Sequence, residues 1–229
     1  MADSGSSTAT LRLTIGDLKI AHPITVPNAA VPARDIVPAL QGLVNAAVTA
    51  AESGQAISCR KGCGACCRQL VPVSRTEGER LLDLVEAMPK ERRREIRRRF
   101  AAAEAVLAPA GFDKRTGKTD RELSTTYFAL GVACPFLEEE SCSIHEERPL
   151  ICREYLVTSP PELCAGPLQE GVTPVAVPKI SLAARKLQDE KDEWFPLALL
   201  MMWGRSRPKG GTRRTGPEWV QRFLKGVAG

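Results

Sequence analysis

Four of the eight cysteines in this 229-residue chain lie within nine residues. They are Cys59, Cys63, Cys66 and Cys67, in the stretch "CRKGCGACC". Spacings of two or three residues let a short loop wrap its thiolates around one centre, as zinc and iron–sulfur sites require. Glycines in the stretch permit tight turns, and its amide groups and cations offset the negative charge of thiolates. We therefore predict that this loop binds metal.

A second group of thiols lies downstream and can complete the site. Cys134, Cys142 and Cys152 form this group. His145 follows Cys142 by three residues, and this spacing makes it a candidate ligand because histidine often joins cysteine in metal sites. Cys164, in "PELCAG", lies apart from both groups in the sequence. We expect it to have no part in metal binding.

The adjacent pair Cys66 and Cys67 bears on the kind of centre. Consecutive side chains generally diverge, so both cannot easily join one tetrahedral site. One of them could bind a second metal, bridge two metals or face the core. Seven cysteines and one histidine would satisfy two four-coordinate metals, or one four-iron cluster with thiols to spare. The count of ligands leaves both arrangements open.

Length and composition indicate the setting of these thiols. A chain of 229 residues can bury a core without disulfides. Its first twenty residues lack the basic start and apolar core of a signal peptide, and no apolar run approaches the ~20 residues of a membrane span. We expect a cytoplasmic protein without a membrane partner. Thiols stay reduced there, which favours metal binding or catalysis over a disulfide framework.

Basic residues are concentrated in two runs, 90–100 and 205–216, and the net charge is +5. In the first run Ile96, Phe100, Ala103 and Leu107 recur at helical spacing, which leaves the arginines on the opposite face. Neither run contains interleaved aromatic residues of the kind that stack on bases. We therefore expect a solvated helix face and disfavour nucleic acid as a partner; a protein partner stays open.

The elements that must position the thiols are mostly helical. The sequence predicts a hairpin turning at Gly16 and Asp17, a proline-dotted connector over 21–33, and a helix over 35–53 that precedes the cysteine loop. A capping box of Thr76 and Glu79 predicts the next helix, which Pro89 ends as another begins. That helix should reach about Leu107 and be followed by a loop over 109–120.

Short apolar pieces flank "EEES" further along, so a small hairpin should bring Cys134 near Cys142. A helix from about Pro149 would carry Cys152. Further helices are expected from Ser181 and over 217–227. The fold class is thus mainly α with small β hairpins, forming an irregular cysteine-rich metal-binding domain.

We expect a single domain over 1–229. Within it, 1–33 form an N-terminal hairpin and connector, 56–157 the cysteine-cluster metal-binding core, and 158–229 a C-terminal helical extension. The sequence contains no HExxH pair, nucleophile elbow, phosphate-binding glycine loop or dinucleotide fingerprint. Catalytic residues cannot be named from it.

The order of these motifs resembles the zinc- or iron-chelating cysteine-cluster family with a CxxxCxxCC pattern, often called YkgJ-like. The similarity covers about residues 56–157 and comprises the first four cysteines, "CPFL" at Cys134–Leu137, Cys142, and "RPLICREY" with Arg148, Pro149, Cys152 and Arg153. The resemblance implies a metal-chelating domain whose cysteines bind iron, as an iron–sulfur cluster, or zinc. A flagellin lysine methylase that uses S-adenosylmethionine has a similar cysteine motif, so methyl transfer is an admissible extension.

Three functions follow as hypotheses. The first is a metal-binding protein, with a 4Fe-4S cluster or zinc, that serves redox chemistry, cluster handling or regulation. Arg60, Arg68 and Arg153, with Arg148 from the matched segment, would then donate hydrogen bonds to sulfur. The second is an S-adenosylmethionine-dependent, methyltransferase-like enzyme that uses the cluster. The third is a zinc-stapled module that contacts a protein or nucleic acid.

Overall fold

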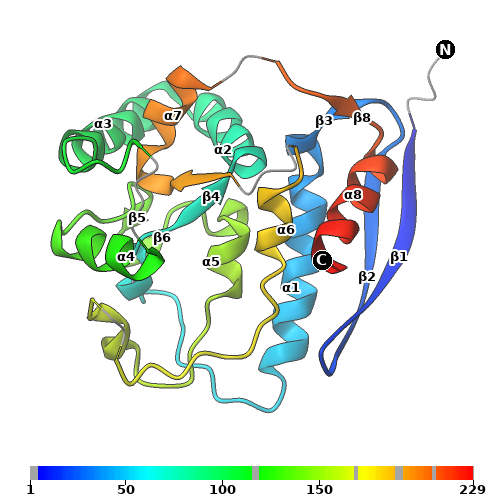
Figure 1. Cartoon of the computed structure of the whole chain (residues 1–229), viewed down its shortest axis with the longest axis horizontal. Helices are drawn as coiled ribbons and strands as arrows, with labels where there is room; N and C mark the ends of the chain where they lie inside the picture. Colours follow the sequence, from blue (N-terminus) through cyan, green and yellow to red (C-terminus); the bar gives the residue numbers. More distant parts are fainter. Residues whose placement is uncertain (1–4, 115–118, 168–169, 189–192, 208–209, 229) are drawn as a thin grey trace.

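The computed structural model describes residues 5–114, 119–167, 170–188, 193–207 and 210–228. These residues form a mainly helical fold with small two-stranded sheets, as the sequence predicts (Figure 1). The α-helices are α1 (Val37–Glu52), α2 (Arg75–Ala87), α3 (Lys90–Leu107), α4 (Asp120–Ala129), α5 (Leu150–Glu154), α6 (Ser181–Arg185), α7 (Leu200–Ser206) and α8 (Gly216–Ala228). The strands are β1 (Ser6–Ile15), β2 (Leu18–Pro27), β3 (Val31–Pro32), β4 (Pro72–Ser74), β5 (Leu137–Glu138), β6 (Ser141–Cys142), β7 (Trp194–Pro196) and β8 (Arg213–Arg214).

The strands pair antiparallel as β1–β2, β3–β8, β4–β7 and β5–β6. Two of these sheets join parts of the chain that are far apart in sequence, since β3 and β4 pair with strands of the C-terminal third. The C-terminal segment therefore holds both the start of α1 and the strand that leads from the cysteine loop into α2.

The N-terminal hairpin turns at Gly16 and Asp17, as predicted, and Gly16 adopts the positive φ of 58° that glycine tolerates. Strand β2 is longer than predicted, because the expected connector over 21–33 is extended as far as Pro27. Its side chains alternate between exposed and buried, so the period of a half-buried strand outweighs the prolines, which an edge strand accepts. The hairpin lies along α1 and α8 (Figure 1).

Helix α2 begins with a capping box, but the box is Ser74 with Glu77 and not the predicted Thr76 with Glu79. The two pairs share the same spacing, so the pattern that predicted Thr76 and Glu79 fits Ser74 and Glu77 equally well. Thr76 and Glu79 lie inside the helix, where Glu79 accepts a hydrogen bond from Arg75. The break at Pro89 and the end of α3 at Leu107 are confirmed.

Helix α4 corrects the prediction of a loop followed by short apolar pieces. A capping box of Thr119 and Glu122 starts it, and Asp120 is its first helical residue. Part of the expected loop, 115–118, lies outside the described residues. The predicted hairpin β5–β6 and the helices that start near Pro149, at Ser181 and after Thr215 are confirmed.

The core consists of three main clusters of buried side chains. The first joins the hairpin to α1, α6 and α8; the second joins α2, α3, β4, β7 and α7; the third joins α3 to α4. Phe136 and Ile144, which flank the β5–β6 hairpin, belong to the second cluster. The downstream cysteines therefore lie on segments anchored in the core.

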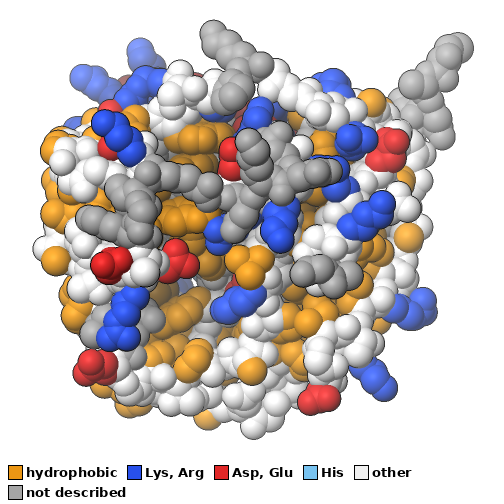
Figure 2. All heavy atoms as spheres, viewed as in Figure 1, with side chains coloured by type: hydrophobic (Ala, Val, Ile, Leu, Met, Phe, Trp, Pro, Cys, Tyr) orange, Lys and Arg blue, Asp and Glu red, His pale blue; other side chains and the backbone are white. Residues whose placement is uncertain are grey.

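The arginines of α3 face solvent, as predicted, and they pair with carboxylates of the chain. Arg97 pairs with Glu86 and Arg98 with Glu95. Figure 2 shows Lys and Arg side chains at several separate places on this face, with a group at the upper left where α3 lies. Among the described residues no helix has the length and apolarity needed to cross a bilayer.

Candidate metal centre

The first cysteine motif, Cys59–Arg68, is a loop that ends in a 3-10 turn at Ala65–Arg68. Backbone bonds shape it: Cys63 N–H donates to Arg60 O at 3.1 Å, and Cys67 N–H donates to Gly64 O at 3.0 Å. Gly62 has a backbone φ of 87°, which residues other than glycine rarely adopt. The glycines thus let the loop reverse direction between successive thiols.

The second cysteine motif, Cys134–Arg153, begins with the β5–β6 hairpin, in which Leu137 pairs with Cys142. The two turn residues, Glu139 and Glu140, both have positive φ, 47° and 55°. A two-residue turn of this kind usually contains asparagine and glycine, so two glutamates store strain of about 1–3 kcal/mol each. Strain of this size persists only where the surroundings hold it in place, and Glu140 pairs with Arg68 of the first motif.

Helix α5 presents Cys152, and a buried carboxylate holds the start of that helix. Glu77 accepts a hydrogen bond from Leu150 N–H at 2.7 Å, while its other oxygen accepts from the Ser74 hydroxyl at 2.7 Å. Glu77, which belongs to the capping box of α2, therefore also caps the first turn of α5. Burial raises the pKa of Glu77, and the hydrogen bond from Ser74 opposes that rise.

Direct bonds join the two motifs. Cys134 N–H donates to Cys67 O at 2.7 Å, and Ser58 N–H donates to Val157 O at 2.9 Å. Gly64 lies where the hairpin meets the first motif, because a Cβ atom there would lie 2.7 Å from Leu137 Cδ1. Backbone hydrogen bonds therefore hold the two motifs in close contact. A side chain at Gly64 would push them apart.

Cys66 lies at the centre of the gathered thiols. Its charge would act on Cys59 in the first motif and on the three thiols of the second, Cys134, Cys142 and Cys152. Its own thiol is next to that of Cys67. Cys63 neighbours Cys59. Each of the seven predicted ligands thus lies within electrostatic reach of at least one other; they are Cys59, Cys63, Cys66, Cys67, Cys134, Cys142 and Cys152.

Burial governs the protonation of several thiols. It raises the pKa of Cys134 to about 12, and it raises the pKa values of Cys59, Cys142 and Cys152. The pKa of Cys66 is raised first by its hydrogen bond with Cys67 and then by burial. Within the described residues, no three Cys, His, Asp or Glu side chains are arranged to hold a single metal ion.

The predicted arginines differ in their surroundings. Arg148 lowers the pKa values of Cys59, Cys66 and Cys142, and its Nε is buried without a hydrogen-bond partner among the described residues. Arg153 donates to Arg148 O, to Asn45 and to the carbonyl oxygen of Glu146. An unpaired cationic donor beside several thiols fits an anionic thiolate–metal centre.

The remaining predicted residues lie further out. Arg68 donates to Gly64 O and to the Glu140 carboxylate, and Arg60 is exposed. The side chain of His145 is 63% exposed, and its Nδ1 lies 3.2 Å from Glu146 Oε1. Cysteine thiolates therefore dominate the donors at the centre, a set that suits zinc and iron–sulfur clusters.

Cys164 lies beside the first motif, although it is distant in sequence. It is 4% exposed, on a 3-10 turn at Pro161–Ala165, and the Gln69 side chain donates to its carbonyl oxygen at 3.0 Å. Its thiol neighbours Tyr155, Cys59 and Cys63. The sequence carried no signal for this placement, since it depends on a side-chain contact across 95 residues.

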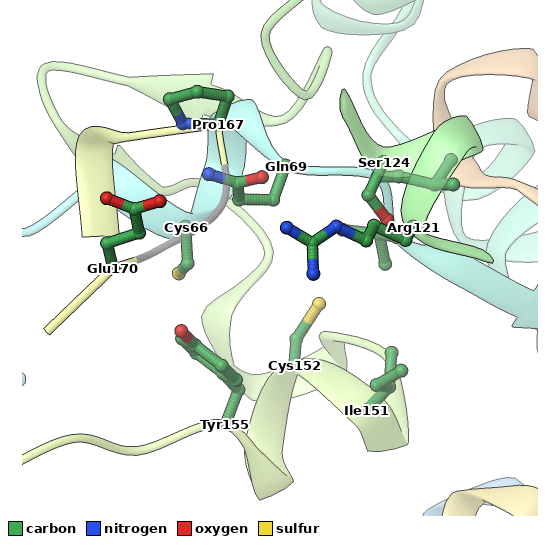
Figure 3. Close-up of a pocket in the computed structure, with 11 residues that line it drawn as sticks. Cys66, Gln69, Arg121, Ser124, Ile151, Cys152, Tyr155, Pro167 and Glu170 are labelled. Carbon is green, nitrogen blue, oxygen red and sulfur yellow. The ribbon is translucent and has the colours of Figure 1, made fainter. Parts of the chain in front are cut away.

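A cavity of about 430 Å³ opens beside the thiols, with Cys66 and Cys152 in its wall. Figure 3 shows both sulfur atoms directed toward the space, with side chains from α4, α5 and the segment after the first motif around them. A small molecule that entered the cavity would therefore lie next to the thiols. The lining residues are Cys66, Gln69, Leu70, Val71, Arg121, Ser124, Ile151, Cys152, Tyr155, Pro167 and Glu170.

Comparison with known proteins agrees with this geometry. The model of a domain family titled "CxxCxxCC: Putative zinc- or iron-chelating domain" matches residues 58–172, half of the chain. The matched segment contains both cysteine motifs and Cys164, so it extends past the expected limit at 157. No curated protein and no solved structure matches the chain.

Proposed function

The chain belongs to the CxxCxxCC family of zinc- or iron-chelating domains, and from this premise we propose that it holds one iron–sulfur cluster, of the 4Fe-4S type, between its two cysteine motifs in the cytoplasm. The observation that carries the proposal is the place of Cys66, whose thiol forms a hydrogen bond with Cys67 and lies within electrostatic reach of Cys59 in its own motif and of Cys134, Cys142 and Cys152 in the other. One shared centre explains this convergence better than two separate ones.

Charge balance favours a single cluster over two zinc ions. Two zinc ions held by seven thiolates and one histidine would place roughly three net negative charges in the site, against roughly two for one four-thiolate centre. Two cations, the half-buried Arg148 and the buried Arg153, act on these thiols. They match the smaller charge, because desolvated charge must be paired.

A bound cluster of this kind supplies one-electron redox chemistry at a potential that its surroundings tune. The residues of the chain would set that potential: the Arg148 Nε is free to donate to sulfur, and backbone N–H groups of the first motif lie close by. A redox role, as an electron carrier or in cluster handling, follows from these contacts.

The cavity favours a second candidate function. Its wall contains Cys66 and Cys152, so a substrate could approach the metal directly, as in an enzyme that uses the cluster on S-adenosylmethionine or another small molecule. A zinc-stapled interaction module, the third hypothesis, would have no use for a 430 Å³ space beside its ligands. The cavity therefore favours the enzyme over the module.

Metal analysis of protein purified without oxygen tests the proposal. We expect iron and acid-labile sulfide in equal amounts, with broad absorption near ~400 nm. Stoichiometric zinc without sulfide, in a colourless protein, would overturn it.

Single substitutions test the ligands. Cys63→Ser and Cys152→Ser, one in each motif, should each lower the iron content and destabilise the fold, because each removes a thiolate. Cys164→Ser is the matched control and should retain iron. Equal iron in all three variants would contradict the assignment of ligands.

A further inference from the structure

The cavity beside the thiols contains polar groups that holding a metal does not require. Arg121 and Ser124 come from α4, which carries no cysteine, and Glu170 lies on the opposite side (Figure 3). Leu70, Val71 and Ile151 complete the lining with apolar surface. A mostly apolar cavity with a few convergent polar groups is the usual form of a small-molecule site.

Arg121 is the strongest of these groups. Its side chain extends from the first turn of α4 into the cavity, and in the view of Figure 3 its guanidinium lies between Gln69 and Cys152. Among the described residues it forms no ion pair. An arginine directed into an apolar-lined space suits a carboxylate, because its planar fork binds both oxygens at once.

Tyr155 supplies a second, independent observation. Its hydroxyl is buried and has no hydrogen-bond partner among the described residues. The Cys164 thiol lies near it, without the geometry of a hydrogen bond. In Figure 3 the ring extends from α5 toward the cavity, with the hydroxyl toward Cys66. Leaving a buried hydroxyl unpaired is unfavourable, so a hydrogen-bond partner on a bound molecule would remove a penalty.

The side chain of Gln69 is a third polar group in the wall of the cavity. Its amide nitrogen donates to Cys164 O and to Gly166 O, both at 3.0 Å, so the direction of the side chain is fixed. Its amide oxygen remains as an acceptor in the wall of the cavity. The cavity therefore offers one cation, the hydroxyls of Tyr155 and Ser124, and the acceptor oxygens of Gln69 and Glu170 around an apolar surface.

We propose that this cavity binds a small organic carboxylate with an apolar body. The carboxylate pairs with Arg121, the body packs on Leu70, Val71 and Ile151, and a further polar group of the ligand meets Tyr155. The position of the ligand next to a metal rests on the proposed function; the binding itself does not. The cavity volume of about 430 Å³ lies within the range of small-molecule sites.

Calorimetric titration of the full, metal-loaded chain tests the proposal with butanoate, hexanoate and 4-phenylbutanoate. Hexanamide is the neutral counterpart of hexanoate. We expect the carboxylates to bind and hexanamide to bind at least about tenfold more weakly, because it loses the charge-assisted hydrogen bonds. Absence of binding by all three carboxylates, or equal binding of hexanamide, would overturn the proposal.

Two variants localise the site. Arg121→Gln should weaken hexanoate binding about tenfold or more, while iron content stays unchanged. Arg94→Gln, at an exposed arginine of α3, is the matched control and should bind like the original chain. Unchanged binding in Arg121→Gln would contradict the site, and loss of iron there would show that Arg121 serves the metal centre instead.

The spectrum of the metal separates this inference from the proposed function. Hexanoate should shift the electron paramagnetic resonance signal of the reduced cluster if the carboxylate lies beside it. Binding without such a shift would overturn the placement of the ligand at the metal. If the protein contains zinc instead of iron, the proposed function fails, while the Arg121-dependent binding should persist.

Discussion

The two cysteine motifs differ in what holds them. In the first motif, Cys59–Arg68, Gly64 is the one buried residue, and the motif contributes no large apolar side chain to the core. In the second motif, Phe136, Ile144 and Leu150 are each at least nine-tenths buried, and Cys134 and Cys142 pack against the core cluster beneath them. One motif is a loop shaped by backbone bonds, and the other is part of the core.

This difference suggests a division of labour in metal binding. Hydrophobic packing orders the second motif whether or not metal is bound, since its elements bury apolar surface of their own. The first motif has little such surface, so binding of metal to its thiolates, as proposed above, would supply much of the free energy that orders it. The second motif would then act as the fixed half of the site and the first as the half that closes.

The largest expected effect is that of Phe136→Ala. Phe136 is 1% exposed and packs edge-to-face on Phe100, with ring centroids 5.2 Å apart. Its removal should lower the free energy of unfolding of the metal-free protein by about 3–5 kcal/mol, because the cavity it leaves cannot fully collapse. Urea denaturation of the apo protein measures this.

Arg60→Ala is the matched truncation in the first motif. Because the Arg60 side chain is exposed, its removal should change the free energy of unfolding by no more than about 0.5 kcal/mol. Similar losses in the two variants would break the comparison between a packed motif and a loop.

Gly64→Ala should have an intermediate effect, and it tests the contact between the two motifs. A Cβ atom at this position would lie 2.6 Å from Glu140 Oε2 and 3.2 Å from Glu140 Cα. The side-chain ends can move but the backbone must shift, so we expect a loss of about 1–2 kcal/mol and weaker retention of metal. Denaturation and iron analysis of the same preparation measure both.

Gly166→Ala is the control, since its Cβ would meet Leu163 O at 3.8 Å, an ordinary contact. If Gly64→Ala retained metal as well as Gly166→Ala does, the close approach of the hairpin to the first motif would be unimportant for the site.

The elements of the second motif could be predicted from the sequence because their signals are local. Proline at 149 opens α5, and the apolar pieces around "EEES" form the hairpin. The same kind of signal misled at α2, where two overlapping capping patterns have equal spacing; the pairing of β4 with β7 keeps Ser74 extended, so the helix starts after it. Helix α4 was missed although Thr119 and Glu122 carry a capping pattern, because polar residues before it favoured a loop.

The contact between the two motifs was predictable, but the surroundings of the site were not. The spacings of the cysteines anticipated that both motifs would meet. The place of Cys164, held through Gln69, and the entry of Arg121 into the cavity depend on contacts between distant segments. A pattern read along the chain carries no information on such contacts, since neither residue has a distinctive local spacing.

The smallest effect is expected from Glu138→Gln, which tests whether charge or apolar packing supports the second motif. Glu138 on β5 accepts hydrogen bonds from Arg92 and from Arg99 Nη1, and the bond from Arg92 is the main cause of its lowered pKa. A carboxyl with a lowered pKa stabilises the fold above its usual pKa and loses that contribution as the pH falls through the lowered value.

At pH 7 the variant should therefore be less stable by about 0.5 kcal/mol, since the pair is partly exposed. The difference should shrink in acid, at a pH below the lowered pKa, where both chains are neutral at this position. Unfolding free energies at the two pH values measure it, with Glu91→Gln on α3 as an exposed control. A loss as large as that of Phe136→Ala would show that ion pairs with α3, and not the apolar core, hold this half of the site.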